Sequence, residues 1–184
     1  MNQTPWKIAE LLEGIPLAAP LSAALATGVS TGIHFDSRRI ETGNLFLAFA
    51  GANVDGCTFA AQALEAGAVA VVSELTPVPG LEGKWIQVLE ARKSLALIAR
   101  RLFGDPTRNG ISVFGVTGTN GKTTTAYLLA SILAAAGHNT GLFGTIEYRI
   151  GQRILSSVNT TPESVELYEH FAELMEATGG PASA

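Results

Sequence analysis

The chain has 184 residues, of which 47% are hydrophobic and 15% are charged, and its formal net charge is −4. This composition is typical of a folded chain of one or two domains and argues against disorder. An acidic chain offers no basic face to a phosphate backbone or to an anionic lipid surface. We therefore expect no nucleic-acid partner and no membrane partner.

The cysteine content and the first residues indicate a compartment. Cys57 is the single cysteine, which excludes an internal disulfide and fits a reducing environment. The first residues lack the apolar segment and the cleavage site of a signal peptide, and no apolar run approaches the ~20 residues of a membrane span. We therefore expect a cytoplasmic protein.

The segment up to about residue 103 is predicted to form a small α/β unit. Thr4 and Pro5 suit the start of a helix from Trp6 to about Leu12, because Thr caps well and Pro is pre-set for the first helical position. Gly67 suits the end of a second helix. The expected strands are 32–35, 45–49, 69–73 and 85–88, the expected helices are 59–65 and 91–103, and 36–39 is a polar turn.

Turn-forming residues fill 104–110 and predict a boundary between a domain over 1–108 and a domain over 109–184. A strand over 111–116, a helix over 122–136 and a strand over 140–143 would form one βαβ unit, which begins a parallel sheet. A hairpin over 148–154, with Gly151 in its turn, and a helix starting within 159–163 with a Thr cap complete the segment. Its sheet has an edge without a partner, so we expect the natural protein to be longer.

The clearest chemical signal is the sequence GVTGTNGKTT at 115–124, between the expected strand and helix. Glycines allow a tight turn whose N–H groups point inward, and a helix N-terminus favours phosphate oxygens. Lys122 would reach the outer phosphates, and Thr123 would give its hydroxyl to Mg²⁺. The standard pattern would place its first glycine at Val116, so the loop is a variant. The alternative, an ordinary strand-to-helix turn, does not account for this context.

This loop resembles that of the muramyl ligase family, which includes folylpolyglutamate synthetases and cyanophycin synthetase relatives. The segment FDSRRIETGNLFLAFAGANVDGCTFAAQALEAGAVAVV resembles the uridine-nucleotide-binding domain of the ligases that add the third or the last peptide unit. GLFGTIEYRIG followed by NTTPES resembles the third-unit ligases in particular. The resemblance runs from about Gly32 to Glu176. Cys57 departs from it, because many relatives have His there.

The resemblance implies an α/β fold, with a small UDP-substrate-binding N-terminal domain followed by the start of a P-loop-type ATP-binding domain with a parallel sheet. It implies an ATP-dependent ligase that adds meso-diaminopimelate or L-lysine to UDP-MurNAc-L-Ala-D-Glu through an acyl phosphate. ATP and Mg²⁺ would be the cofactors, the partners would be small-molecule substrates, and the protein would be a monomer. The family's remaining metal ligands and its amino-acid specificity motif are expected beyond Ala184.

The resemblance also assigns site residues. Lys122 would be the catalytic residue and Thr123 the metal ligand, and ATP would contact Thr117, Gly118, Thr119, Asn120, Gly121, Lys122, Thr123 and Thr124. Ser37 and Arg38 would contact the UDP part of the substrate, where spacing alone favours a solvated turn. The muramyl-peptide part would contact Asn159, Thr160 and Thr161, which could equally cap a helix.

Two other functions stay open at this point. One is a sister ligase, which adds D-Ala-D-Ala or makes cyanophycin. The other is a non-catalytic fragment that binds a nucleotide or a UDP-sugar without turnover. The three histidines, His34, His138 and His170, have no metal-ligand spacing, and we expect them to have surface or incidental roles.

Overall fold

The computed structural model describes residues 4–50, 55–106, 108, 110–157 and 160–177, and the chain divides into two compact units, Met1–Leu102 and Phe103–Ala184. The division lies a few residues before the predicted boundary at 108. Within the described ranges, no helix is long and apolar enough to cross a membrane. Each unit has a β-sheet of its own.

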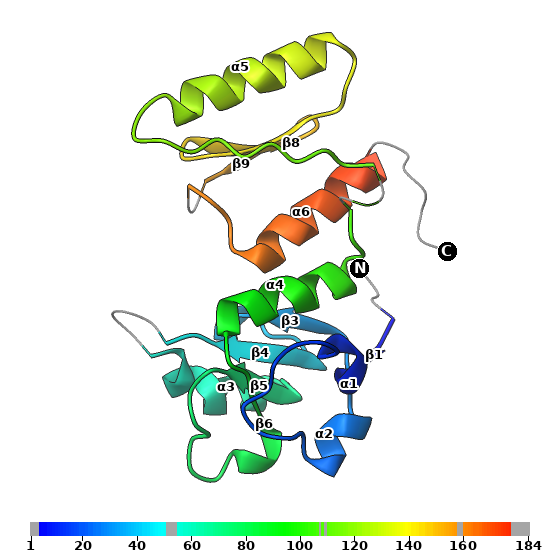
Figure 1. Ribbon diagram of the computed structural model, residues 1–184, viewed down its shortest axis with the longest axis vertical. Helices are drawn as coiled ribbons and strands as arrows, with labels where there is room; N and C mark the ends of the chain where they lie inside the picture. Colours follow the sequence, from blue (N-terminus) through cyan, green and yellow to red (C-terminus); the bar gives the residue numbers. More distant parts are fainter. Residues whose placement is uncertain (1–3, 51–54, 107, 109, 158–159, 178–184) are drawn as a thin grey trace. The chain divides into compact units, whose positions relative to one another are not determined.

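Unit 1 is built on a four-stranded sheet whose neighbouring strands are all parallel (Figure 1). Its order is β3 (Gly32–His34), β4 (Asn44–Ala48), β5 (Ala70–Ser73) and β6 (Trp85–Gln87). The central strands β4 and β5 are buried on both faces, as expected for a parallel sheet covered by helices. Because the strands are parallel, their carboxyl ends meet at one edge of the sheet.

Helices cover both faces of this sheet. The helices are α1 (Ile8–Leu11), α2 (Ala23–Thr27), α3 (Ala60–Glu65) and α4 (Ala91–Leu102), with 3₁₀ turns η1 (Ser37–Arg39), η2 (Gly56–Phe59) and η3 (Glu82–Lys84). On β4, Phe46 packs in one cluster with Ala60 and Ala63 of α3, with Val71 of the neighbouring β5 and with Trp85 of β6. Helix α4 buries its predicted apolar stripe, which includes Leu95, Ile98 and Ala99, beside β3 and β4.

The predicted strands and the helices α3 and α4 of unit 1 are confirmed to within about two residues, and the predicted turn at 36–39 contains η1. The first helix forms within its predicted range, but its start was predicted wrongly. Trp6–Lys7 forms strand β1, which pairs antiparallel with β2 (Val29–Ser30), and the helix begins only at Ile8. Lys7, and not Thr4, occupies the N-cap position. Pairing with a segment more than twenty residues away overrides the local capping signal.

Gly67 follows α3 with φ +110°, which an L side chain rarely adopts, and this confirms its predicted role. A Cβ at this position would lie 2.8 Å from Thr42 Oγ1 and 2.9 Å from Thr42 Cα. We expect Gly67→Ala to lower the free energy of unfolding of unit 1 by about 2 kcal/mol or more, because strain and the clash add.

Urea unfolding followed by tryptophan fluorescence measures this loss, since both tryptophans, Trp6 and Trp85, lie in unit 1. Gly83→Ala is the control, because its Cβ would meet nothing within 4 Å and its φ is not positive. Equal unfolding midpoints for the two variants would contradict the prediction.

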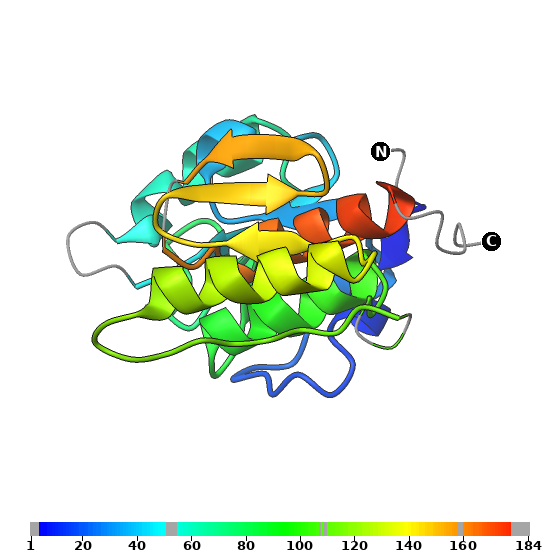
Figure 2. The same ribbon diagram turned by 90° about the horizontal axis from the view of Figure 1, so that it is seen from above.

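Unit 2 has a three-stranded antiparallel sheet with a helix on each face (Figures 1 and 2). Its elements are α5 (Lys122–Ala135), β7 (Gly141–Phe143), β8 (Glu147–Ile150), β9 (Arg153–Ser156) and α6 (Ser164–Ala177). The hairpin of β8 and β9 confirms the prediction for 148–154. Gly151 has φ +57° and Gln152 has no positive φ, which fits a type II′ turn and not type I′.

The α/β class is confirmed, but two details of unit 2 were predicted wrongly. Residues 111–116 form no strand, and β7 pairs antiparallel with β8, so the parallel sheet lies in unit 1 and no βαβ unit forms in the described part of unit 2. An apolar run becomes a strand only beside a partner, and Val113 and Phe114 are 56% and 61% exposed.

The last helix begins at Ser164, later than predicted, and a glutamate takes the capping place that was expected for Thr. The carbonyl of Glu163 accepts the first helical bond from the Leu167 N–H at 3.0 Å. The carboxylate of Glu166 accepts the Glu163 N–H at 3.3 Å, which is half of a capping box. The threonines before this helix are therefore not needed as caps.

Candidate functional site

The glycine-rich loop over 115–121, which is the candidate phosphate loop, leads directly into α5, and its backbone requires glycine at two positions. Gly118 has φ +144°, and Gly121 has φ +79° in the left-handed region. Gly121 is the N-cap residue of α5, and no side chain caps the helix there. The first N–H groups of α5 have no partners within the helix, so they remain available to an anion.

The amine of Lys122 folds back across this loop. Its Nζ donates to the carbonyl oxygen of Gly118 at 2.6 Å, which places an ammonium beside the N-terminus of α5. Thr123 follows in the first helical turn and is half-buried, whereas the loop residues Thr117–Gly121 are exposed. An uncapped helix N-terminus, an ammonium group and a threonine hydroxyl fit a triphosphate with a bound Mg²⁺. The described residues hold no group of three or more acidic, cysteine or histidine side chains for a metal.

A second set of contacts lies beyond the loop in unit 2. The hydroxyl of Thr145, between β7 and β8, lies 3.3 Å from that of Thr160, so the structure brings Thr160 to this end of the sheet. Thr160 and Thr161 are both at the start of the segment that leads into α6, Thr160 is exposed, and Asn159 lies outside the described residues.

A hydrogen bond joins helix α5 to strand β8, because the Tyr127 hydroxyl of α5 donates to Glu147 of β8 at 2.8 Å. Arg149 also donates to this carboxylate, and its guanidinium lies 5.2 Å from the centre of the Tyr127 ring.

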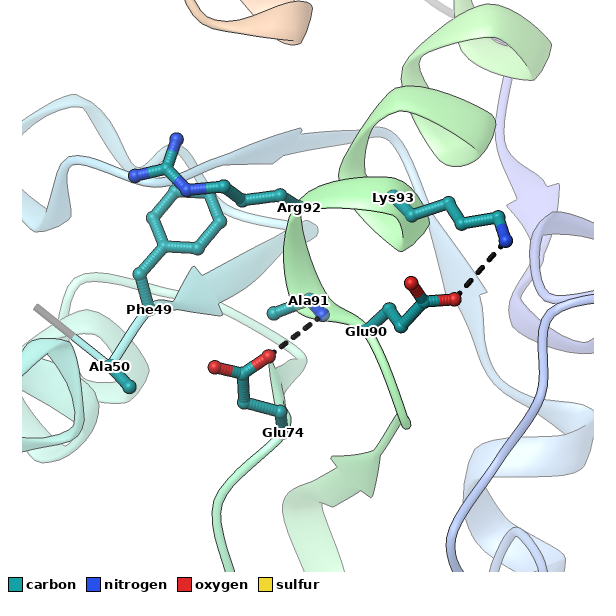
Figure 3. Close-up of a pocket in the computed structure, with 7 residues that line it drawn as sticks. All are labelled: Phe49, Ala50, Glu74, Glu90, Ala91, Arg92 and Lys93. Atoms are coloured by element: carbon teal, nitrogen blue, oxygen red, sulfur yellow. Dashed lines mark hydrogen bonds and ion pairs between the residues drawn. The ribbon is translucent and has the colours of Figure 1, made fainter.

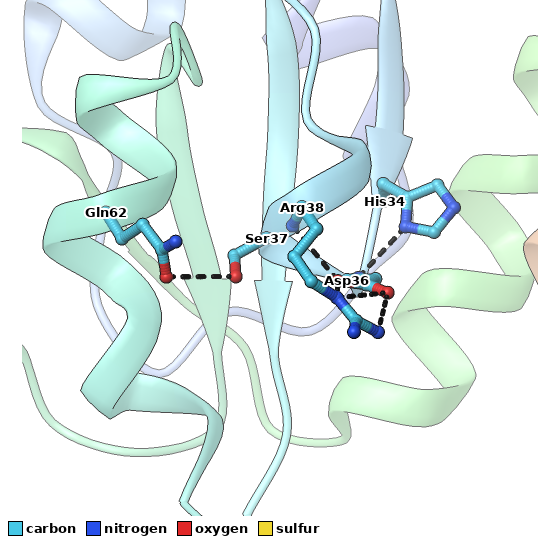
Figure 4. A network of polar contacts seen from close by, with 5 residues as sticks. All are labelled: His34, Asp36, Ser37, Arg38 and Gln62. Carbon is cyan, nitrogen blue, oxygen red and sulfur yellow. Dashed lines mark hydrogen bonds and ion pairs between the residues drawn. The ribbon is translucent and has the colours of Figure 1, made fainter.

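In unit 1, the predicted UDP-binding turn follows the carboxyl end of β3 (Figure 4). Asp36 accepts the backbone N–H of Arg38 at 3.0 Å and the guanidinium of Arg38 at 2.7 Å. This pairing lowers the pKa of Asp36 to about 2. The Ser37 hydroxyl donates to Gln62 of α3 at 3.3 Å, and the Arg38 side chain is 82% exposed. The turn therefore presents a hydroxyl and a cation at the carboxyl edge of the sheet.

His34 does not lie at the surface, since only 5% of it is exposed, so the surface alternative is excluded for this histidine. It lies in β3, where both faces are covered, and its ring stacks on Phe35 with centroids 5.0 Å apart. Its Nδ1 accepts the backbone N–H of Asp36 at 2.9 Å. Burial, with a smaller effect of Arg39, lowers the pKa of His34 from 6.5 to about 4.

This pKa predicts that unit 1 loses stability in weak acid. Between pH 6.5 and about pH 4, the unfolded chain binds a proton at His34 that the folded unit does not bind. The contribution of His34 to the free energy of unfolding should therefore be constant above pH 6.5 and should fall as the pH drops below it. The total loss should be roughly 3 kcal/mol, since one pKa unit corresponds to about 1.4 kcal/mol. Urea titrations followed by tryptophan fluorescence at several pH values measure it.

A variant without the titrating ring, His34→Asn, is the control and should show a flatter dependence across this window. His138 and His170 lie in unit 2, so they do not contribute to a signal that comes from Trp6 and Trp85. A wild-type slope equal to that of His34→Asn would contradict the assignment.

The same edge of the sheet carries a cavity of about 340 Å³ (Figure 3). Phe49 follows β4, Glu74 follows β5, and Arg92 lies in the first turn of α4. The Arg92 guanidinium lies 4.5 Å from the centre of the Phe49 ring, and Glu74 accepts the Ala91 N–H at 3.2 Å. In parallel α/β sheets, ligands bind outside the carboxyl ends of the strands. The cavity and the turn at Ser37 both occupy that edge.

Three features of these sites had no counterpart in the sequence predictions. Gln62 was assigned only to a helix, and the cavity at Phe49 and Arg92 was not foreseen. The rule that ligands bind at the carboxyl edge of a parallel sheet could have identified Phe49, because it is the last residue of a predicted strand. Gln62 and the contact of Tyr127 with Glu147 depend on how elements pack together, and sequence spacing carries no signal for them.

Two family descriptions match the chain. Residues 29–102 match the description "Mur ligase family, catalytic domain", and residues 116–180 match "Mur ligase middle domain". The chain is 50% identical over 172 residues to a protein of Solibacter usitatus and 46% identical over 147 residues to one of Geobacter sulfurreducens. Both are named "UDP-N-acetylmuramoyl-L-alanyl-D-glutamate--2,6-diaminopimelate ligase". These alignments cover 94% and 79% of this chain but 35% and 28% of the relatives, so the chain spans about a third of their length.

Solved structures show the same fold. A solved UDP-N-acetylmuramoyl-L-alanyl-D-glutamate--2,6-diaminopimelate ligase aligns with a TM-score of 0.71 at 24% identity, over 95% of this chain and 34% of that one. A parallel sheet covered by helices, followed by a glycine-rich loop before a helix N-terminus, places the chain in the α/β class. With the matches above, the chain belongs to the Mur ligase family.

Proposed function

We propose that this chain belongs to an ATP-dependent ligase that joins a diamino acid to UDP-MurNAc-L-Ala-D-Glu in peptidoglycan synthesis. The observation that carries the proposal is the uncapped N-terminus of α5, with the Lys122 amine folded across the loop before it. The names of the relatives supply the substrate, and their diaminopimelate favours meso-diaminopimelate over L-lysine. We further propose a cytoplasmic monomer.

In this proposal, the loop Thr117–Thr124 binds the phosphates of ATP. Lys122 leaves the Gly118 carbonyl for a phosphate oxygen and neutralises charge on the group being transferred. Mg²⁺, when bound, supplies further neutralisation of the phosphates, and Thr123 is its ligand from this chain. The substrate carboxylate oxygen attacks the γ-phosphorus of ATP, so that ADP leaves and an acyl phosphate forms. The amine nitrogen then attacks the carbonyl carbon, and phosphate leaves as the amide forms and the nitrogen loses its proton to solvent.

The substrate would extend along two surfaces. Its uridine nucleotide part would contact Ser37 and Arg38 at the carboxyl edge of the parallel sheet, where an exposed guanidinium suits a diphosphate. Its muramyl-peptide part would contact Thr160 and Thr161, which precede α6, and Asn159 beside them. On this basis the domain over 1–108 binds the UDP-substrate, and the residues over 109–184 belong to the ATP-binding domain.

The test is phosphate release by the protein encoded by the complete reading frame, with ATP, Mg²⁺ and UDP-MurNAc-L-Ala-D-Glu. Meso-diaminopimelate and L-lysine are added in parallel reactions. We expect release that depends on meso-diaminopimelate. Turnover only with UDP-MurNAc-tripeptide and D-Ala-D-Ala would assign the sister ligase, and nucleotide binding without any release would assign a non-catalytic binding protein.

A further inference from the structure

His34 is a buried imidazole next to an exposed turn. It is the last residue of β3, and only 5% of it is exposed, whereas the side chain of Arg38 four positions later is exposed. Its two ring nitrogens have different surroundings. Nδ1 accepts the Asp36 N–H at 2.9 Å, and Nε2 is buried with no hydrogen-bond partner among the described residues.

These contacts determine the tautomer of the ring. A nitrogen that accepts an N–H carries no proton, so the proton of the neutral His34 ring is on Nε2. The buried Nε2–H is then an unpaired donor among the described residues, and such a group has a free-energy cost on folding. An apolar residue at this position would avoid that cost. The hydrogen bond that a histidine makes here, and that an apolar residue could not make, is the one between Nδ1 and the backbone N–H of Asp36.

That contact is the first of two successive bonds along the turn. His34 holds the N–H of the residue two positions later, and Asp36 in turn holds the N–H of Arg38, also two positions later, at 3.0 Å. Between the two held amides lies Ser37, whose hydroxyl donates to Gln62 at 3.3 Å. The backbone of Ser37 is therefore fixed on both sides, and its side chain is directed towards α3.

We propose that His34 is a positioning residue for substrate binding, whose unprotonated Nδ1 holds the turn in the conformation that presents Ser37 and Arg38 to a uridine nucleotide. The inference rests on the proposed function of unit 1. His34 acts through Asp36 and does not itself contact the ligand. Its effect on affinity therefore depends on an acceptor atom at this place, and not on an imidazole ring as such.

The experiment compares two substitutions in the 184-residue chain. His34→Asn keeps an acceptor, because an Asn side chain can accept the N–H two residues later. His34→Leu keeps apolar bulk but removes the acceptor. Calorimetric titration with UDP-MurNAc-L-Ala-D-Glu gives the Kd, at a temperature where tryptophan fluorescence shows unit 1 folded in each variant.

We expect His34→Leu to raise the Kd about tenfold and His34→Asn to stay within about threefold of the wild type, as for the loss and retention of one hydrogen bond. Equal Kd values for wild type and His34→Leu would overturn the role of His34 and leave the proposed function intact. Failure of the wild-type chain to bind would instead remove the proposed function of unit 1 and the inference with it.

A measurement on the wild type alone covers the case in which His34→Leu does not fold. A long-range ¹H–¹⁵N spectrum at pH 7 should show the His34 ring with Nδ1 unprotonated, and saturation with the same ligand should shift its signals. The exposed His138 ring of unit 2 is the reference that should stay in place. A proton on Nδ1, or a His34 ring that does not respond to bound ligand, would overturn the proposal.

Discussion

If the proposed ligase activity holds, Lys122→Ala should lower its turnover by about 10²–10³-fold, as for removal of one preorganised donor to developing charge. The Lys122 amine is the cation that the structure places on the phosphate loop, where it donates to the Gly118 carbonyl at 2.6 Å. Alanine keeps helical propensity at the start of α5, so the loop and the helix should persist. Phosphate release by the product of the complete reading frame measures turnover, and ADP titration of the 184-residue chain measures binding.

Two further variants sharpen this test. Lys7→Ala removes an exposed lysine of unit 1 that pairs with Glu10 at 3.6 Å, and it should leave both readouts unchanged. Lys122→Arg keeps the charge but replaces a compact ammonium with a planar guanidinium, so its turnover should fall between those of wild type and Lys122→Ala. Lys122→Ala turnover within about threefold of the wild type would contradict phosphoryl transfer at this loop.

The sequence predicted unit 1 well because its signals are local. Strands β4 and β5 are short β-branched and apolar runs between turn formers, and α4 has an apolar stripe at helical spacing. It failed at Trp6 and Lys7, where a two-residue strand forms by pairing with Val29–Ser30. It failed again over 111–116, because strand propensity does not show whether a partner strand is present.

The candidate site residues also fall into a group that local sequence predicts and a group that depends on packing. The candidate phosphate loop could be proposed from the sequence because its chemistry follows from consecutive residues, and the glycines at 118 and 121 have the positive φ that such a turn requires. The burial of His34 and the contact of Gln62 with Ser37 could not be predicted, because each depends on how the elements pack together. From sequence alone, a histidine in a short strand is expected to be polar and exposed. Its burial is known only once the structure shows that both faces of the sheet are covered.

Phe46→Ala should have the largest effect on stability that we predict, a loss of about 3–5 kcal/mol in the free energy of unfolding of unit 1. Phe46 is 1% exposed on the central strand β4 and belongs to one cluster with Ala60 and Ala63 of α3, Val71 of β5 and Trp85 of β6. Since small domains have only about 5–15 kcal/mol in total, unit 1 would be marginal at room temperature. Urea unfolding of the 184-residue chain, followed by tryptophan fluorescence, gives the midpoint and the slope.

Because Trp85 belongs to the same cluster, the midpoint and not the fluorescence amplitude is the quantity to compare. Leu89→Ala removes a leucine that is 59% exposed and should change the free energy by no more than about 0.5 kcal/mol. Strand β4, which carries Phe46, ends just before Phe49, and Phe49 lines the cavity at the carboxyl edge of the sheet. Loosening β4 should therefore also weaken the proposed binding of the uridine nucleotide. A loss below about 1 kcal/mol would mean that the core of unit 1 is not packed around β4. The residues at the carboxyl edge of the sheet would then have to be held in place by other elements of unit 1.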